Sequence, residues 1–174
     1  MRAVVVYESM FGNTHIVADH IAEGLLEHAE VEVVTVAEAT PDLLAGVDLV
    51  VVGGPTHVHG LSRESTRAEA VERADDADND LHLDPDAEGE GLREWFESLA
   101  GGDGTAAAAF DTRVDMSPLV TGRASKGIAK RLRHHGFRLV TDPESFLVDK
   151  ETHLVAGEED RAQSWGASLS VPGT

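Results

Sequence analysis

The stretch Val4–Thr14, which reads VVVYESMFGNT, decides the fold of this chain. Its opening run is apolar, rich in β-branched residues and free of polar alternation, so it predicts a strand buried on both faces. A short polar loop follows, and the apolar positions after it have the spacing of an amphipathic helix. A strand, a polar loop and a helix N-terminus in this order can form an anion pocket, because backbone N–H groups and the helix dipole both attract negative charge.

The loop itself carries groups that suit a phosphate. Ser9 and Thr14 offer hydroxyl donors, Asn13 offers an amide, and Gly12 lets the main chain approach a bound group closely. No lysine stands among residues 9–14, so any anion would bind through neutral donors, unlike the nucleotide loop that ends in Gly-Lys-Ser/Thr. The alternative is an ordinary strand-to-helix turn whose polar residues cap the helix.

Strands and helices alternate along the rest of the chain. The further strands are expected at Val31–Val36, Asp48–Val52, Thr105–Phe110 and a last strand made of Phe137–Val140 and Ser145–Val148. The expected helices are Thr14–Glu27, Pro41–Leu44, Ser65–Ala74 with a serine cap, Leu92–Leu99, Ser125–His134 and Glu158–Leu169. Asp142-Pro143 interrupts the last strand, which places it at a sheet edge. We expect one domain over residues 1–174, with a mobile acidic loop at about 75–91.

Such alternation predicts an α/β fold with a parallel sheet covered on both faces. Ligands bind these sheets at the carboxyl ends of the strands. Three loops should meet there, namely Glu8–Thr14, Gly53–Ser62 after a strand that ends at Gly53, and Asp111–Thr121. The sequence therefore predicts one composite site.

The second loop has small and rigid residues that allow a close approach to a ligand. Pro55 fixes the turn, Thr56 can hydrogen-bond a heterocycle edge, and His57 offers a flat surface for stacking. His57 and His59 could also suggest a metal pair, but no carboxylate or cysteine nearby completes a ligand set, so we predict no metal. In the third loop, Arg113 supplies either a counter-charge for a ligand or an ordinary surface ion pair with a neighbouring aspartate.

Composition limits the possible partners and location. The net charge of −18 over 174 residues repels nucleic acid and anionic membranes and would steer encounters with basic protein surfaces, although it also fits a salty cytoplasm. Cysteine is absent, which excludes disulfides and thiolate chemistry. No apolar stretch approaches the roughly 20 residues of a membrane helix. The N-terminus enters a strand without the layout of a signal peptide, which predicts a cytoplasmic location.

Two motifs resemble those of the flavodoxin family. Ser9–Thr14 resembles the family's phosphate loop, Ser/Thr-x-Thr-Gly-x-Thr, and Gly53–Gly60 is similar to its second flavin loop, Gly-x-Pro-Thr-(x)-x-x-Gly. The resemblance implies a flavodoxin-like three-layer sandwich, with a five-stranded parallel sheet of order 2-1-3-4-5 and helices on both faces. It also implies FMN as the cofactor.

The resemblance assigns site residues by position. The phosphate would be held by Ser9, Met10, Phe11, Gly12, Asn13 and Thr14. One side of the isoalloxazine would be lined by Pro55, Thr56, His57, Val58 and Gly60, and its other side or edge by Asp111, Thr112 and Arg113. Phe11 replaces a frequent threonine, His57 replaces a frequent tryptophan, and the third loop lacks the usual tyrosine.

These assignments imply an FMN-binding electron-transfer protein whose redox partner has a basic surface. Electron transfer requires no protein acid or base, and we predict no catalytic residue. Two alternatives remain open: an NAD(P)H:quinone-type FMN reductase, whose ring face the missing aromatics would leave accessible, and a flavin-free protein-interaction module. A homodimer could complete the flavin site.

Overall fold

The computed structural model describes residues 1–57, 60–74, 81–85, 87 and 89–171. Its strands are β1 (Arg2–Tyr7), β2 (Glu30–Thr35), β3 (Leu49–Pro55), β4 (Ala106–Val114), β5 (Arg138–Leu139) and β6 (Glu144–Val148). Its helices are α1 (Asn13–Leu25), α2 (Pro41–Leu44), α3 (Glu64–Ala74), α4 (Leu92–Ser98), α5 (Pro118–Thr121), α6 (Ala124–His134) and α7 (Glu158–Ser168). Each predicted element is present within a few residues of its expected bounds.

The strands form one parallel sheet of order β2-β1-β3-β4-β5, which confirms the predicted α/β sandwich and its 2-1-3-4-5 order. The fifth position is shared by two short strands. β5 pairs with the start of β4 and β6 with its end, and Asp142-Pro143 lies between them as predicted. Proline lacks the N–H that a ladder needs, so an edge tolerates this interruption.

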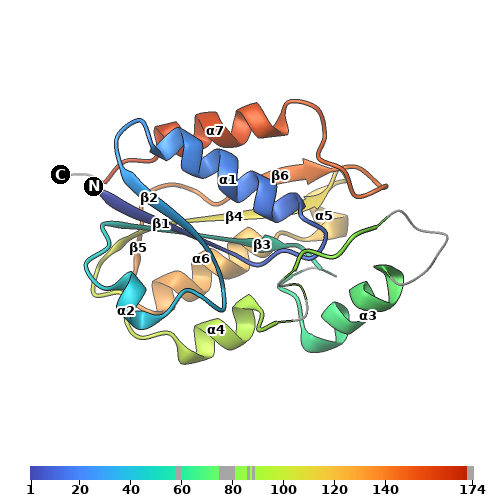
Figure 1. Cartoon of the computed structure of the whole chain (residues 1–174), viewed down its shortest axis with the longest axis horizontal. Coiled ribbons are helices and arrows are strands. Elements are labelled where there is room, and N and C mark those ends of the chain that lie inside the picture. Colours follow the sequence, from blue (N-terminus) through green and yellow to red (C-terminus); the bar gives the residue numbers. More distant parts are fainter. Residues whose placement is uncertain (58–59, 75–80, 86, 88, 172–174) are drawn as a thin grey trace.

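Helices cover both faces of the sheet (Figure 1). α1 and α7 lie together on one face, and α4 and α6 lie on the other. Alternate residues of a strand point to opposite faces. Val4 and Val6 therefore pack in one hydrophobic cluster with Trp95 of α4, whereas Val5 packs in a second cluster with Ile21 of α1.

Two strands extend further than the sequence indicated. β3 does not end at Gly53 but continues through Pro55, because Gly53, Gly54 and Pro55 pair in register with β4 residues from Phe110 to Thr112. β4 continues to Val114 because its end pairs in register with β6. Position 53 must be a glycine because the Phe110 ring occupies the space that a side chain would need. A β-carbon there would lie 2.1 Å from the ring. The two glycines, which in the sequence resemble the end of a strand, are needed because neighbouring side chains leave no room for a β-carbon at either position.

The helix α3 occupies a different position from the others. It lies beyond the carboxyl ends of the strands and covers neither face of the sheet (Figure 1). It begins at Glu64, so Ser65 is its second residue and not the cap that we expected. This position brings α3 next to the loops of the predicted site.

Candidate functional site

The first loop joins β1 to α1 through a left-handed glycine. Gly12 has φ +87° and forms the N-cap of α1, and its N–H donates to Ser9 Oγ at 3.1 Å. A β-carbon at Gly12 would meet no heavy atom within 4 Å, so the space above it is open. α1 has no side-chain cap and no acidic residue in its first turn. The positive end of the helix therefore faces this loop without a protein carboxylate from its own first turn to neutralise it.

Two side chains of the loop are tied to distant segments. The Thr14 hydroxyl shares a buried hydrogen bond of 2.7 Å with the Thr112 hydroxyl of β4. Asn13 Nδ2 donates to the carbonyl oxygen of Thr152, which follows β6, at 2.7 Å. These contacts fix the start of α1 against β4 and the chain after β6.

A cleft of about 170 Å³ collects residues from all three predicted loop regions. Its lining includes the predicted residues Met10, Phe11, Asn13, Thr14, Pro55, Thr56, His57, Thr112 and Arg113. Arg73, Val114, Val148 and Thr152 complete it among the described residues. The carboxyl ends of β1, β3 and β4 thus bring their loops to one place, as parallel topology requires.

The remaining predicted residues do not line this cleft. Ser9 borders a smaller cavity of about 40 Å³ beside Tyr7 and Thr35. Asp111 is fully buried, and its Oδ2 accepts a hydrogen bond from Ser125 N at the start of α6, at 2.7 Å. Gly12 and Gly60 are not among the lining residues, and Val58, like His59, lies outside the described residues.

The second loop is closed by its own backbone. His57 and Gly60 exchange both backbone hydrogen bonds at 2.8 Å. Thr56 Oγ1 accepts from Ala124 N at 2.9 Å, so this hydroxyl caps α6. Burial lowers the pKa of His57, and the positive charges of Arg67 and Arg73 lower it further. A neutral, flat imidazole therefore stands at the cleft wall near neutral pH.

The third region is a strand end followed by an exposed turn. Asp111, Thr112 and Arg113 belong to β4 and not to a loop, which corrects the expected placement. Arg113 Nη1 donates to the carbonyl oxygens of Val114 and Met116, and the described residues provide no ion pair for it. In and beside α5, the apolar side chains of Met116, Leu119 and Val120 are exposed.

A buried carboxylate that the sequence analysis did not select lies behind the second loop. Glu8 directly follows β1 and is 6% exposed. One of its oxygens accepts from the Ser62 hydroxyl, and the other accepts from Leu92 N at the start of α4, at 2.8 Å. Burial raises the pKa of Glu8, while these two bonds and Arg67 oppose the rise. The sequence did contain a signal for this buried carboxylate, because Glu8 is an acidic residue that immediately follows an apolar strand.

Glu8 should make stability depend on pH. A carboxyl whose pKa is raised in the folded state stabilises the fold below its ordinary value of 4.5, and this contribution is lost as pH rises through the raised value. Glu8→Gln removes the titration and keeps the shape, so the stability of the variant relative to the native protein should increase with pH above 4.5. Urea unfolding of both proteins over a pH series measures this difference.

A matched control uses a carboxyl with the opposite shift. Burial alone would raise the pKa of Glu94, but its bonds with Arg67 and Gly91 N–H lower it. Its stabilising effect is therefore present above 4.5 and lost at lower pH. Glu94→Gln should lose stability relative to the native protein as pH rises. If the free energies of unfolding of the native protein and Glu8→Gln differed by the same amount at every pH, the raised pKa assigned to Glu8 would be contradicted.

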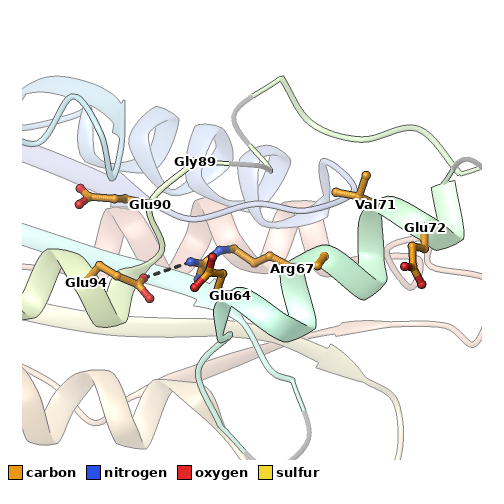
Figure 2. A pocket seen from close by; sticks show the side chains of 8 residues that line it. Glu64, Arg67, Val71, Glu72, Gly89, Glu90 and Glu94 are labelled. Carbon is orange, nitrogen blue, oxygen red and sulfur yellow. Dashed lines mark ion pairs between the residues drawn. The ribbon is translucent and has the colours of Figure 1, made fainter.

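A larger cavity of about 610 Å³ lies on another side of α3 (Figure 2). Arg67 points from α3 to Glu94, and the two form an ion pair at 3.4 Å. Glu64, Glu72 and Glu90 give the rest of the lining an acidic character. The cavity contains none of the residues predicted for the site, so the motifs point to the smaller cleft.

Part of the acidic segment is anchored on the first loop. Asp84 N donates to Met10 O at 2.8 Å, and Asp84 Oδ2 lies 3.2 Å from His15 Nδ1. The Met10 side chain is buried with Ala70 of α3 and Ala87. Residues 75–80, 86 and 88 lie outside the described residues, so the mobility expected of 75–91 stays a prediction.

Three exposed side chains after β6, those of Asp149, Glu151 and His153, hold potential metal-ligand atoms within 4.8 Å of one another. Exposed groups of this kind are common in proteins without a metal, and we assign none here. In the described part of the chain, the helices are too short or too polar to cross a lipid bilayer.

Comparisons with known proteins agree with this architecture. The sequence model of the flavodoxin family matches residues 5–114. A flavodoxin from the domain Archaea is 21% identical, with a TM-score of 0.62, and the match covers 96% of this chain and 94% of that one. Oxidised Flavodoxin 1 from Bacillus cereus is 21% identical, with a TM-score of 0.64 and coverage of 98% and 100%.

The fold also occurs within a larger protein. The flavodiiron protein from Giardia intestinalis is 17% identical, with a TM-score of 0.59, and the match covers 97% of this chain but 35% of that one. No curated protein sequence matches. At these identities the structures show a shared fold, and the family model covers most of the chain, including the first two motifs. The chain belongs to the flavodoxin family.

Proposed function

We propose that this protein binds FMN in the cleft between the three strand ends and transfers electrons to a partner protein. The observation that carries the proposal is the cleft itself, in which residues of both family motifs meet at the uncapped N-terminus of α1. FMN supplies a ring that accepts and releases electrons, and the protein sets its environment.

The residues present fit a phosphate at the first loop. Gly12 leaves open space, the first turn of α1 adds its dipole, and the described lining of the cleft contains no aspartate or glutamate. The backbone N–H groups of residues 10, 11, 13 and 14 and the hydroxyls of Ser9 and Thr14 would hold the phosphate, while the Gly12 N–H donates to Ser9 Oγ. Phe11 would contribute through its backbone.

The isoalloxazine would lie between the second loop and the end of β4. The cleft of about 170 Å³ is smaller than the roughly 300–1,000 Å³ typical of enclosed ligand sites, so the ring would remain partly exposed. An exposed ring edge suits electron transfer between proteins. His57 would offer a neutral face to the ring, and Leu119 and Val120 of α5, which follows β4 in the chain, are exposed apolar side chains.

A titration of the purified protein with FMN, FAD and riboflavin tests the proposal. We expect FMN to bind more tightly than riboflavin, because only the phosphate reaches the first loop. With neither tryptophan nor tyrosine against the ring, affinity should fall by about 1–3 kcal/mol relative to a site with both. Equal affinity for all three flavins would contradict the proposal, and so would a failure to bind any of them. The failure to bind any flavin would favour a flavin-free interaction module.

The open ring face favours one second candidate, an NAD(P)H:quinone-type FMN reductase. The described lining of the cleft from β4 contains Thr112, Arg113 and Val114 and no aromatic side chain. A nicotinamide could then approach the ring. Consumption of NADH or NADPH by the FMN-loaded protein, with a quinone as acceptor, would separate the reductase from an electron carrier. Sedimentation of the loaded protein would test the proposed homodimer.

A further inference from the structure

The segment that follows β4 differs in charge from the rest of the molecule. Acidic residues outnumber Lys and Arg by 32 to 14 over the whole sequence. Residues 116–141 contain α5, α6 and β5, and they include no acidic residue. The Lys and Arg of this segment are Arg123, Lys126, Lys130, Arg131, Arg133 and Arg138. The net charge of −18 therefore does not describe this part of the chain.

The helix α6 turns three of these charges toward solvent. Ile128 and Leu132 are buried on its inner side, whereas Lys126, Lys130 and Arg133 are exposed. The spacing of four and then three positions places the exposed residues on one face of the helix. In the part of the chain that the structure describes, none of these three side chains forms an ion pair. We call these three residues the basic face of α6.

Neighbouring positive charges are compensated and do not belong to this face. Arg131 is partly buried toward α4; burial and Arg93 lower its pKa, and Glu97 opposes the change. The Arg123 guanidinium donates to Ser145 Oγ at 2.9 Å and to the carbonyl oxygen of residue 143 at 2.6 Å. Both arginines thus have partners within the fold, unlike the basic face.

Helix stability alone does not explain the basic face. Basic residues in the last turn, such as Arg133, complement the negative end of the helix dipole. Lys126 lies in the first turn, where the dipole is positive and α6 has no acidic residue. Lys126 and Lys130 are also four positions apart, so their charges repel. A purely structural helix would favour an acid in at least one of these two positions.

Exposed apolar side chains connect the basic face to the cleft. Among the described residues, five large apolar side chains are exposed, and three of them lie in or beside α5: Met116, Leu119 and Val120. Arg113 lines the cleft and donates to Met116 O at 2.6 Å. Thr56 also lines the cleft, and its hydroxyl accepts from the first N–H of α6 at 2.9 Å. α5 lies near the end of β4, and α6 runs back along the sheet from it (Figure 1).

We propose that α5 and the basic face of α6 form the docking surface for an electron-transfer protein whose contact area is apolar and bordered by Asp and Glu. A cluster of exposed apolar side chains marks an interaction surface, and a partner of opposite charge completes it. The apolar part argues against a nucleic acid, which binds mainly through its phosphates. The partner would then lie beside the open edge of the flavin.

The inference rests on the proposed electron transfer and goes beyond it, because it places the partner on one side of the cleft and gives the sign of its charge. That sign is opposite to the one that the net charge of the whole chain favours. Salt screens exposed charges over about 10 Å at 0.1 M ionic strength, so a docked partner interacts mainly with the local surface.

Electron transfer to two acceptors of opposite charge tests the proposal. The reduced, FMN-loaded protein is mixed with an acidic blue-copper protein or with cytochrome c, a basic haem protein, at about 0.1 M ionic strength. Lys126→Glu and Lys130→Glu should each lower the rate with the acidic acceptor about fivefold and raise the rate with the basic one. Stopped-flow absorbance measures the rates. Each variant is compared with the native protein for the same acceptor, which removes differences in driving force.

Arg63→Glu is the matched control. Arg63 is exposed, precedes α3 and does not line the cleft, and its reversal changes the net charge by the same amount. Both rates should stay close to those of the native protein. Urea unfolding should show no loss of stability in the lysine variants, because an acid in the first turn of α6, or one four positions from Lys126, is favourable there. Equal rates in the control and the lysine variants would overturn the docking surface.

Carbodiimide cross-linking tests the same surface without flavin. The reagent joins an amine and a carboxylate as an amide, and the sequence contains three lysines, Lys126, Lys130 and Lys150. Mass spectrometry should find the acidic acceptor joined to Lys126 or Lys130. This result in a protein that fails to bind FMN would overturn the proposed function and keep the docking surface. Cross-links at Lys150 alone, or a native dimer that Lys126→Glu dissociates in sedimentation, would overturn the docking surface and leave FMN binding intact.

Discussion

Gly166→Ala is expected to lower the free energy of unfolding by about 3 kcal/mol, at the upper end of the range for overpacked interiors. α1 and α7 touch backbone to backbone at two glycines. A β-carbon at Gly166 would lie 2.1 Å from Ile21 O, and one at Gly24 would lie 2.0 Å from Gln163 O. Backbone atoms cannot rotate away as side chains do, so the helices must separate. Thermal or urea unfolding measures the loss.

The same substitution elsewhere provides the control. Gly127 lies in α6, where an added β-carbon would lie 3.7 Å from Arg131 Nη1, which is an ordinary van der Waals contact. Gly127→Ala should therefore stabilise the protein by about 0.5–1 kcal/mol, because alanine is the better helix former. If Gly166→Ala were as stable as Gly127→Ala, the close contact of α1 with α7 would be wrong.

Gly12→Asp should reduce FMN affinity by at least about a hundredfold. The carboxylate would project into the open space above the first loop, where we place the phosphate. Repulsion between these charges a few ångströms apart costs about 3 kcal/mol at a partly exposed site, and each 1.4 kcal/mol corresponds to roughly tenfold in affinity. Riboflavin, which has no phosphate, should bind the variant and the native protein alike. Titration of both flavins measures the effect.

Gly12→Asn separates charge from backbone strain. Gly12 has φ +87°, and asparagine and aspartate tolerate this region better than other side chains, at a cost of about 1 kcal/mol. The two variants share shape and strain, and they differ in charge. Gly12→Asn should therefore keep most of the FMN affinity that Gly12→Asp loses. Equal affinities in the two variants would place the phosphate somewhere else.

The sequence predicted the order and type of the elements because the signals for them are local. The uninterrupted valine run of Val4–Val6 indicates a strand covered on both faces, and helical spacing after Thr14 indicates a helix. The proline at 143 indicated an interrupted edge, which β5 and β6 confirm. The alternation of strands with helices indicated a parallel sheet, whereas the strand order 2-1-3-4-5 came from the resemblance to the flavodoxin family.

Strand ends were harder to predict because pairing decides them. Gly53 and Gly54 read as a break along the chain, yet the register with Phe110 and Asp111 keeps both inside β3. The space that glycine leaves is filled by Phe110, which lies far away in sequence. A local pattern cannot indicate which distant ring will need that space.

The sequence by itself determined the sandwich, the loop order and the two family motifs, since each depends on neighbours in the chain. Only the tertiary structure decided that Glu8 is buried with Ser62 and Leu92, that Asn13 is tied to Thr152, and that α3 brings Arg73 to the cleft. These features join residues separated by 54, 84 and 139 positions in the hydrogen-bonded cases. Burial and charge at such contacts arise only once packing has brought distant segments together.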